Sequence, residues 1–337
     1  MKQQRKRRSM EPKVSLPVRH HARIAGSQSG DALVNASIGP GGDLIALWSA
    51  PADVPAVRST TTQPGWAVFP DPRASRPVTA RVTLHSPALS NVVTIHDFPL
   101  AHPTVQPLPD GRVLAVGARA RWRQDGPDRN AIIYSADGTA LAAETLGDGI
   151  EHVFTTGTGH VWVGYFDEGV FGNFGWGRAD GREPIGSCGL VRFSPDLKVD
   201  WRFPFHEDNP WGAISDCYAL NVDADTAWTC YYTSFPIVRV HDGVLAGWRG
   251  DGTAANALIT DGSRIALYGG YSADRDRLVV GQLSDGQMRS SGEYRVVLPG
   301  GEELPGDARV IGRGPDLHIL TGTDWYRLDL TDVPAES

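Results

Sequence analysis

Two stretches of the sequence gather carboxylates, amides and aromatic rings that could bind a small molecule. The stretch 167–188 begins with two adjacent carboxylates and then sets three aromatic residues among glycines, which permit tight loop conformations. The stretch 204–213 adds a histidine, two further carboxylates and a tryptophan. Pockets for sugars or peptides combine apolar and aromatic walls with a few such polar groups. We therefore expect a ligand-binding site made by Asp167, Glu168, Asn173, Trp176, His206, Glu207, Asp208 and Trp211.

The same residues have a plainer explanation. The aromatic rings of 167–188 could pack as a small core of their own loop, with the charged groups facing water. A loop of this length inside a compact domain needs something to order it, and either a ligand or such a core would serve. Both interpretations stay open at the level of sequence.

A second constellation lies at the beginnings of the expected innermost strands. Six polar residues occupy these positions: Asp31, His102, Glu151, Asp216, Asn256 and Asp307. If the register is right, they form a ring at the mouth of a central channel. Oxygen-rich sets of Asp, Glu and Asn suit a hard cation such as Ca²⁺. No motif in the sequence establishes a cofactor. The candidate metal ligands are Glu151, Asp216, Asn256 and Asp307.

The elements that would position these residues are four-stranded units, of which 151–203 is the clearest. Two β-branched and aromatic runs flank the turn Gly157-Thr158-Gly159, which is typical of a hairpin. Two more runs follow at 190–193 and 198–203, and the last alternates apolar and charged residues as a half-buried strand does. An antiparallel meander of four short strands is the blade of a β-propeller.

Six such units account for most of the chain, with a long Pro-rich insertion expected at 51–77. The sixth unit supplies only three strands, and the lone expected strand near 18–24 would complete it. This closure would leave no open sheet edge in the ring. We predict an all-β fold with one domain over 12–334, a six-bladed β-propeller of four-stranded blades closed by an N-terminal strand. The expected units are 32–95, 102–145, 151–203, 216–248, 256–298 and 308–330.

The segments HVWVGYFDEG and GLVRFS carry a resemblance to a known repeat. They resemble the regulator-type propeller repeat, in which a strand ending Trp-Val-Gly is followed by Gly-Leu-x-Arg-Phe. The whole chain also resembles uncharacterised bacterial six-bladed propeller proteins. Neither resemblance implies an activity. The expected ring of polar strand starts resembles the channel site of six-bladed calcium-dependent lactonases, without any further lactonase motif.

The first eleven residues are expected to be a disordered basic tail. Five Lys and Arg residues lie within the first nine positions, with no apolar segment of a secretory signal after them. An alternative is that translation begins at Met10. Without these five charges the net charge of −7 becomes about −12, which argues against a nucleic-acid partner.

Three cysteines without a CxxC pair indicate reduced thiols and a cytoplasmic location. No apolar run is long enough to cross a bilayer, so we expect no membrane partner. The patterns GxSxG, HExxH and Walker A are absent from the sequence. These observations leave two candidate functions. The first is a binding propeller for a small molecule, protein or peptide, with its site on 167–188 and 204–213. The second is a metal-dependent hydrolase, lactonase or lyase with its cation at the channel mouth.

Overall fold

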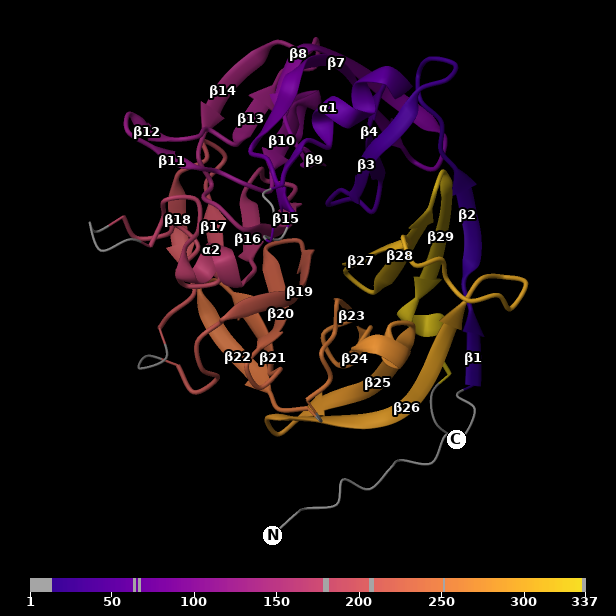
Figure 1. Cartoon of the computed structure of the whole chain (residues 1–337). Helices are drawn as coiled ribbons and strands as arrows, with labels where there is room; N and C mark the ends of the chain where they lie inside the picture. Colours follow the sequence, from indigo (N-terminus) through magenta and orange to yellow (C-terminus); the bar gives the residue numbers. More distant parts are fainter. Residues whose placement is uncertain are drawn as a thin grey trace.

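The computed structural model describes residues 14–62, 65, 68–177, 182–205, 209–250 and 252–334. Six sheets stand in a ring around a central space (Figure 1), and each contains a four-stranded antiparallel meander. This confirms the predicted six-bladed β-propeller. The expected basic tail at 1–11 lies outside the described residues. No helix in the described ranges is both long and apolar enough to cross a membrane.

The blades follow one another along the chain, and each begins at the channel and ends at the outer rim (Figure 1). Blade 1 comprises β3 (Ala32–Ile38), β4 (Leu44–Ser49), β7 (Arg73–His85) and β8 (Leu89–Leu100). Blade 2 comprises β9 (Pro103–Pro107), β10 (Val113–Gly117), β13 (Ala131–Tyr134) and β14 (Ala140–Glu144). Blade 3 comprises β15 (Ile150–Thr155), β16 (Val161–Tyr165), β17 (Leu190–Phe193) and β18 (Val199–Arg202). Blade 4 comprises β19 (Asp216–Asp223), β20 (Thr226–Tyr232), β21 (Ile237–His241) and β22 (Val244–Trp248). Blade 5 comprises β23 (Ala257–Thr260), β24 (Arg264–Tyr268), β25 (Arg277–Ser284) and β26 (Gln287–Val297). Blade 6 comprises β27 (Arg309–Arg313), β28 (Asp316–Thr321), β29 (Asp324–Asp329) and β2 (Arg19–Arg23).

The second strands of blades 1, 3 and 4 carry large rings that pack between neighbouring blades. Trp48, Trp162 and Trp228 lie on β4, β16 and β20 and are almost fully buried. Trp48 and Trp162 belong to one apolar cluster that extends over five of the blades. The turn before Trp162 uses Gly159 at φ 89°, a conformation that favours glycine. Burial of these rings explains why the repeat keeps Trp beside β-branched residues.

The ring is closed by the N-terminal segment, as predicted. β2 pairs antiparallel with β29 and becomes the outer strand of blade 6. The prediction of one lone strand was incomplete, because β1 (Val14–Pro17) pairs in parallel with β26 on blade 5. The Val18 N–H still donates to the Val297 carbonyl at 2.9 Å, and the chain then crosses to blade 6, where β2 begins at Arg19. This segment buries its own side chains of Leu16, Val18 and Ile24 against the blades.

Blade 1 differs most from its expected boundaries. β7 begins at Arg73, although the expected insertion ran to residue 77. The polar run at its start shows no alternation, yet it pairs with the extended β8 through an irregular register near Val78. The rest of the insertion contains the short elements η1 (Pro51–Asp53), α1 (Val54–Val57), β5 (Thr60–Thr61) and β6 (Phe69–Pro70).

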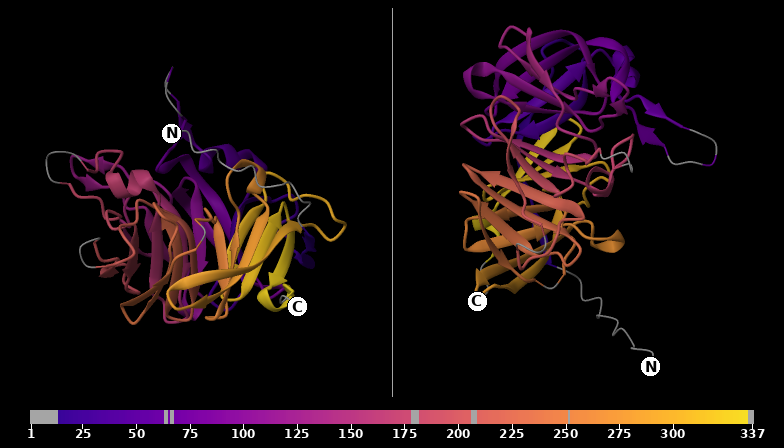
Figure 2. Two further views of the ribbon diagram at one scale, coloured as in Figure 1. Left: turned by 90° about the horizontal axis from the view of Figure 1, so that it is seen from below. Right: turned by 90° about the vertical axis from the view of Figure 1, so that its left-hand side faces the viewer.

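Two side views show that the long connections share one face of the ring (Figure 2). The β5–β6 hairpin and α2 (Asp167–Phe171) both project from that face. It is also the face where the innermost strands begin. We call it the loop face. A further short hairpin, β11 (Trp122–Arg123) with β12 (Gly126–Pro127), follows the second strand of blade 2.

Candidate functional site

A cavity of about 700 Å³ lies in the central channel, among the innermost strands of the blades. Its walls come from β3, β9, β15, β19, β23 and β27 and from the residues just before them (Figure 1). The polar side chains that matter for chemistry are Thr104, Glu151, His152, Asn256, Asp307 and Arg309. Glu151 and Asp307 are exposed, so the cavity communicates with the loop face.

The opposite end of the channel is closed by side chains that bridge strands. Asn221 on β19 donates to the carbonyls of Leu258 (2.8 Å) and Gly314 (2.9 Å) and accepts from the Gly314 N–H (2.8 Å). Arg313 on β27 donates through Nη2 to the carbonyl of Thr155, at 2.6 Å. This last bond joins blade 6 to blade 3, across the ring. The cavity is therefore a blind pocket rather than an open tunnel.

A second bridge completes this floor. Gln106 on β9 donates to Ser37 Oγ at 2.5 Å and to the carbonyl of Ile38 at 3.1 Å. Its carbonyl oxygen accepts from the Thr155 backbone N–H, at 3.0 Å. Gln106 is fully buried, and these bonds satisfy its amide as a buried amide requires.

Arg309 is the cationic group of the cavity wall. Its side chain is half-buried, and within the described part of the chain its guanidinium forms no hydrogen bond or ion pair. Burial lowers the pKa of Arg309, and the negative charge of Glu151 opposes that shift. Neighbouring His152 donates from Nε2 to the carbonyls of Cys217 (3.1 Å) and Tyr218 (3.2 Å). Burial also lowers the pKa of His152, so this imidazole is neutral near pH 7 and Arg309 supplies the positive charge.

Three carboxylates come close together where blades 3 and 4 meet the loop face. Asp216 begins β19, which lies against α2 with Asp167 at its start. Burial, with the charges of Asp167 and Glu151, raises the pKa of Asp216 to about 6. The local field at this rim is therefore negative.

The predicted metal ring is assembled only in part. Glu151, Asn256 and Asp307 line the same cavity, and Asp216 lies close enough to Glu151 to feel its charge. Asp31 instead forms an ion pair with Arg81 on the third strand of its own blade. His102 is bonded through Nε2 to the carbonyl of Ser59, at 2.8 Å. Among the described residues, no three His, Cys, Asp or Glu side chains are placed to hold a metal ion.

Replacing Asp216 with asparagine should stabilise the protein at neutral pH but not in acid. The raised pKa means that folding disfavours the charged carboxylate, so the parent loses stability as pH rises from about 4 to about 6. The variant cannot ionise and escapes that loss, which we expect to be on the order of 1 kcal/mol for a half-buried group. Urea unfolding of both proteins at pH 4 and pH 8 measures it. An equal gain at both pH values would contradict this origin.

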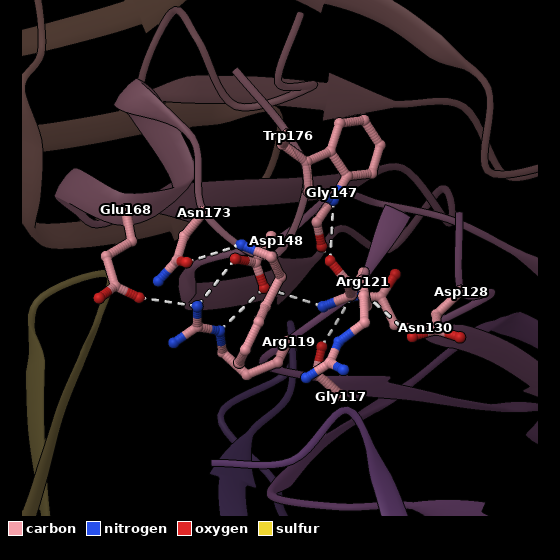
Figure 3. A network of polar contacts seen from close by, with 12 residues as sticks. Gly117, Arg119, Arg121, Asp128, Asn130, Gly147, Asp148, Glu168, Asn173 and Trp176 are labelled. Atoms are coloured by element: carbon pink, nitrogen blue, oxygen red, sulfur yellow. Dashed lines mark hydrogen bonds and ion pairs between the residues drawn. The ribbon is translucent and has the colours of Figure 1, made fainter. Parts of the chain in front are cut away.

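The loop predicted to hold the ligand is anchored by a buried ion-pair network (Figure 3). The guanidinium of Arg119 makes two bonds of 2.8 Å to the Asp148 carboxylate, and the two side chains are only 3% and 2% exposed. Glu168 from α2 adds a second carboxylate, 2.7 Å from Arg119 Nη2. The ring of Phe174 lies 4.4 Å from the same guanidinium. Glu168 thus ties α2 to blade 2.

Trp176 packs inside this loop. Its indole N–H donates to the carbonyl of Ala120 at 2.8 Å (Figure 3), and the side chain is 4% exposed. Its ring meets Trp122 edge-on, with centroids 4.8 Å apart. Asn173 accepts from the next backbone N–H, that of Phe174, at 2.7 Å. This geometry matches the plainer explanation of a loop core for Trp176, while Asp167 remains exposed.

Trp211 lines a different, smaller cavity of about 360 Å³ on blade 4. Its half-buried ring lies under the guanidinium of Arg249, 5.6 Å from the ring centroid. Hydroxyls of Ser215, Thr233 and Ser234 line the same cavity. The predicted residues His206, Glu207 and Asp208 lie outside the described residues. Trp211 therefore belongs to a separate cavity from the channel, and the predicted site stays a prediction.

The sequence reasoning missed the channel residues that the structure brings together with Glu151. Thr104, His152 and Arg309 were not singled out, although each falls inside or beside an expected innermost strand. The available signal was the register of the sixth unit, in which Arg309 is a charged residue within a strand expected to face the channel. Loop length is visible in a sequence, whereas the channel exists only once the six innermost strands come together.

No family model and no curated protein matches this chain. Solved structures with a similar arrangement include apo AztD from Citrobacter koseri, at 12% identity over 90% of this chain and 85% of that one, with a TM-score of 0.42. A catalytically inactive virginiamycin B lyase from Staphylococcus aureus with quinupristin is 9% identical over 91% and 97%, with a TM-score of 0.39. A chain of the nidogen/laminin complex is 12% identical over 79% and 94%, with a TM-score of 0.38. The fold assignment stands on this chain's own strand order.

Proposed function

We propose that this propeller binds a small polar molecule in its central channel, entering from the loop face. The observation that carries the proposal is the blind cavity of about 700 Å³ whose wall holds Arg309, a guanidinium with no ion-pair partner among the described residues. Pockets for small ligands usually measure about 300 to 1,000 Å³ and place a few polar groups on a largely fixed frame. Here the frame is six β-strands, held at the floor by Asn221, Gln106 and Arg313.

Of the loops first expected to hold the ligand, the one that begins with α2 would form the outer part of the same site. Asp167 on α2 is exposed and lies near Asp216 at the rim. Trp211 instead packs against Gly247 on β22, the outermost strand of blade 4. A larger ligand, such as a peptide, would reach Asp167 while one end occupies the channel.

Metal-dependent hydrolysis or lyase chemistry remains a prediction from the sequence. The side-chain geometry of the described residues adds no support to it, because Asp31 and His102 have other partners and no three metal-binding side chains converge.

Filling the channel should abolish binding without disturbing the fold. Thr104 on β9 lines the cavity and is partly exposed within it, so Thr104→Phe places a ring in the ligand's space. Thr60→Phe, at an exposed position on the β5–β6 hairpin, is the matched control. A library of small metabolites is screened by thermal shift on the parent and on both variants. We expect hits that stabilise the parent and Thr60→Phe but not Thr104→Phe.

Two results would contradict the channel as the site. One is a set of confirmed ligands that bind Thr104→Phe as well as the parent. The other is a broad screen that finds no ligand for the parent, although Thr104→Phe remains folded. Circular dichroism of each variant shows whether the fold is kept.

A further inference from the structure

The channel has a gradient of charge from its mouth to its floor. At the mouth stand the carboxylates of Glu151 and Asp307, and Asp216 lies near both Glu151 and Asp167. Asp307 lies in the turn just before β27, which begins with Arg309 in the cavity wall and ends with Arg313 at the floor. The mouth is therefore acidic and the interior basic.

Arg313 places a positive charge at the floor, and its single hydrogen bond to a carbonyl does not neutralise that charge. The residue is 4% exposed, and its Nε and Nη1 atoms have no hydrogen-bond partner among the described residues. Its guanidinium lies 5.3 Å from the ring of Phe154, which lines the cavity. Burial lowers the pKa of Arg313 to about 10, although the negative charge of Asp223 opposes that shift. An anion held above it in the channel would further offset the cost of burying this cation.

Arg309 and Glu151 do not cancel one another. They are close enough for each charge to influence the other, but they form no ion pair within the described part of the chain. A guanidinium that faces a cavity with its donors free is suited to bind a carboxylate by two parallel hydrogen bonds. Among the described residues, Arg309 is the one guanidinium that lines the wall, which suits a singly charged carboxylate better than a phosphate dianion.

We infer that the channel ligand is zwitterionic, with a carboxylate directed inward to Arg309 and a cationic amine directed outward to the acidic mouth. This inference rests on the proposed function, since it assigns a ligand class to the same cavity. Asp307 lies in the turn that precedes β27, and Arg309 is the first residue of β27, so both side chains line one cavity a short distance apart along the chain. A ligand with two opposite charges on a short linear chain would satisfy both ends at once.

Three probes of equal chain length test the two ends separately. They are 5-aminopentanoate, which carries both charges, pentanoate, which carries only the carboxylate, and pentylamine, which carries only the amine. Isothermal titration calorimetry of the full chain gives each affinity. We expect 5-aminopentanoate to bind at least about tenfold more tightly than either singly charged probe, which corresponds to one additional satisfied charge.

Variants assign each charge of the probe to its residue. Arg309→Gln should weaken 5-aminopentanoate about tenfold, to the level of pentylamine, and leave pentylamine unchanged. Asp307→Asn should instead weaken pentylamine and 5-aminopentanoate and leave pentanoate unchanged. Arg289→Gln, which removes an exposed arginine 71% accessible on β26, is the matched control and should change none of the three.

The inference is wrong if 5-aminopentanoate fails to bind at millimolar concentration, if pentanoate binds as tightly as the zwitterion, or if Arg309→Gln leaves all three affinities unchanged. The Thr104→Phe screen separates this failure from that of the proposed function. Ligands of other charge that Thr104→Phe excludes would keep the channel as the site and overturn only the ligand class. Ligands that Thr104→Phe still binds would overturn both.

Discussion

Replacing Asp148 with alanine is expected to lower the free energy of unfolding by about 3 to 5 kcal/mol. Asp148 holds Arg119 through two bonds and also accepts from the Ala120 N–H at 2.9 Å. Its removal leaves a guanidinium 3% exposed with only Glu168 as a counter-charge. Because Glu168 is 29% exposed, water screens it and it replaces the lost carboxylate only in part.

The matched control is an exposed ion pair between blades 2 and 3. Glu144 and Lys198 lie 2.5 Å apart with exposures of 37% and 66%, and Glu144→Ala should change stability by less than about 1 kcal/mol. Urea unfolding followed by tryptophan fluorescence measures both variants. A loss for Asp148→Ala no larger than that for Glu144→Ala would show that the buried network contributes nothing special.

The fold could be predicted because its main signals are local and repeated. The unit 151–203 shows alternation and turns within a short stretch, and β15 to β18 follow it closely. The closing strand was predictable by counting, since the sixth unit has three strands of its own and β2 supplies the fourth. Both inferences needed only sequence neighbours and the requirement that sheet edges be covered.

The features that escaped depend on contacts between distant segments. β1 pairs with β26, nearly the whole chain away, and nothing in its four residues specifies that partner. Asp31 leaves the expected ring because Arg81, fifty residues later, binds it. Arg309 becomes a candidate ligand group only when five other innermost strands close the channel around it. Residue type shows what a side chain could do, but the partner it finds across the ring decides what it does.

Deleting residues 1–24 should prevent the ring from closing. The deletion removes β1 and β2 together with the buried side chains of Leu16, Val18 and Ile24. Burial of three such side chains stabilises a fold by roughly 5 to 9 kcal/mol, which is comparable to the whole stability of many domains, about 5 to 15 kcal/mol. The outer edges of β29 and β26 would also lose their partners and become free to pair with other chains.

The control is a deletion of residues 1–13, which ends just before β1 and leaves every described contact of the closing segment in place. Thermal unfolding by circular dichroism and size-exclusion chromatography compare the two truncations. The shorter deletion should melt as one cooperative transition from a monodisperse species, whereas the longer one should aggregate or lose its transition. If the longer deletion melted within a few degrees of the shorter, blade 6 would be stable with three strands, and closure by β2 would not be what holds the propeller together.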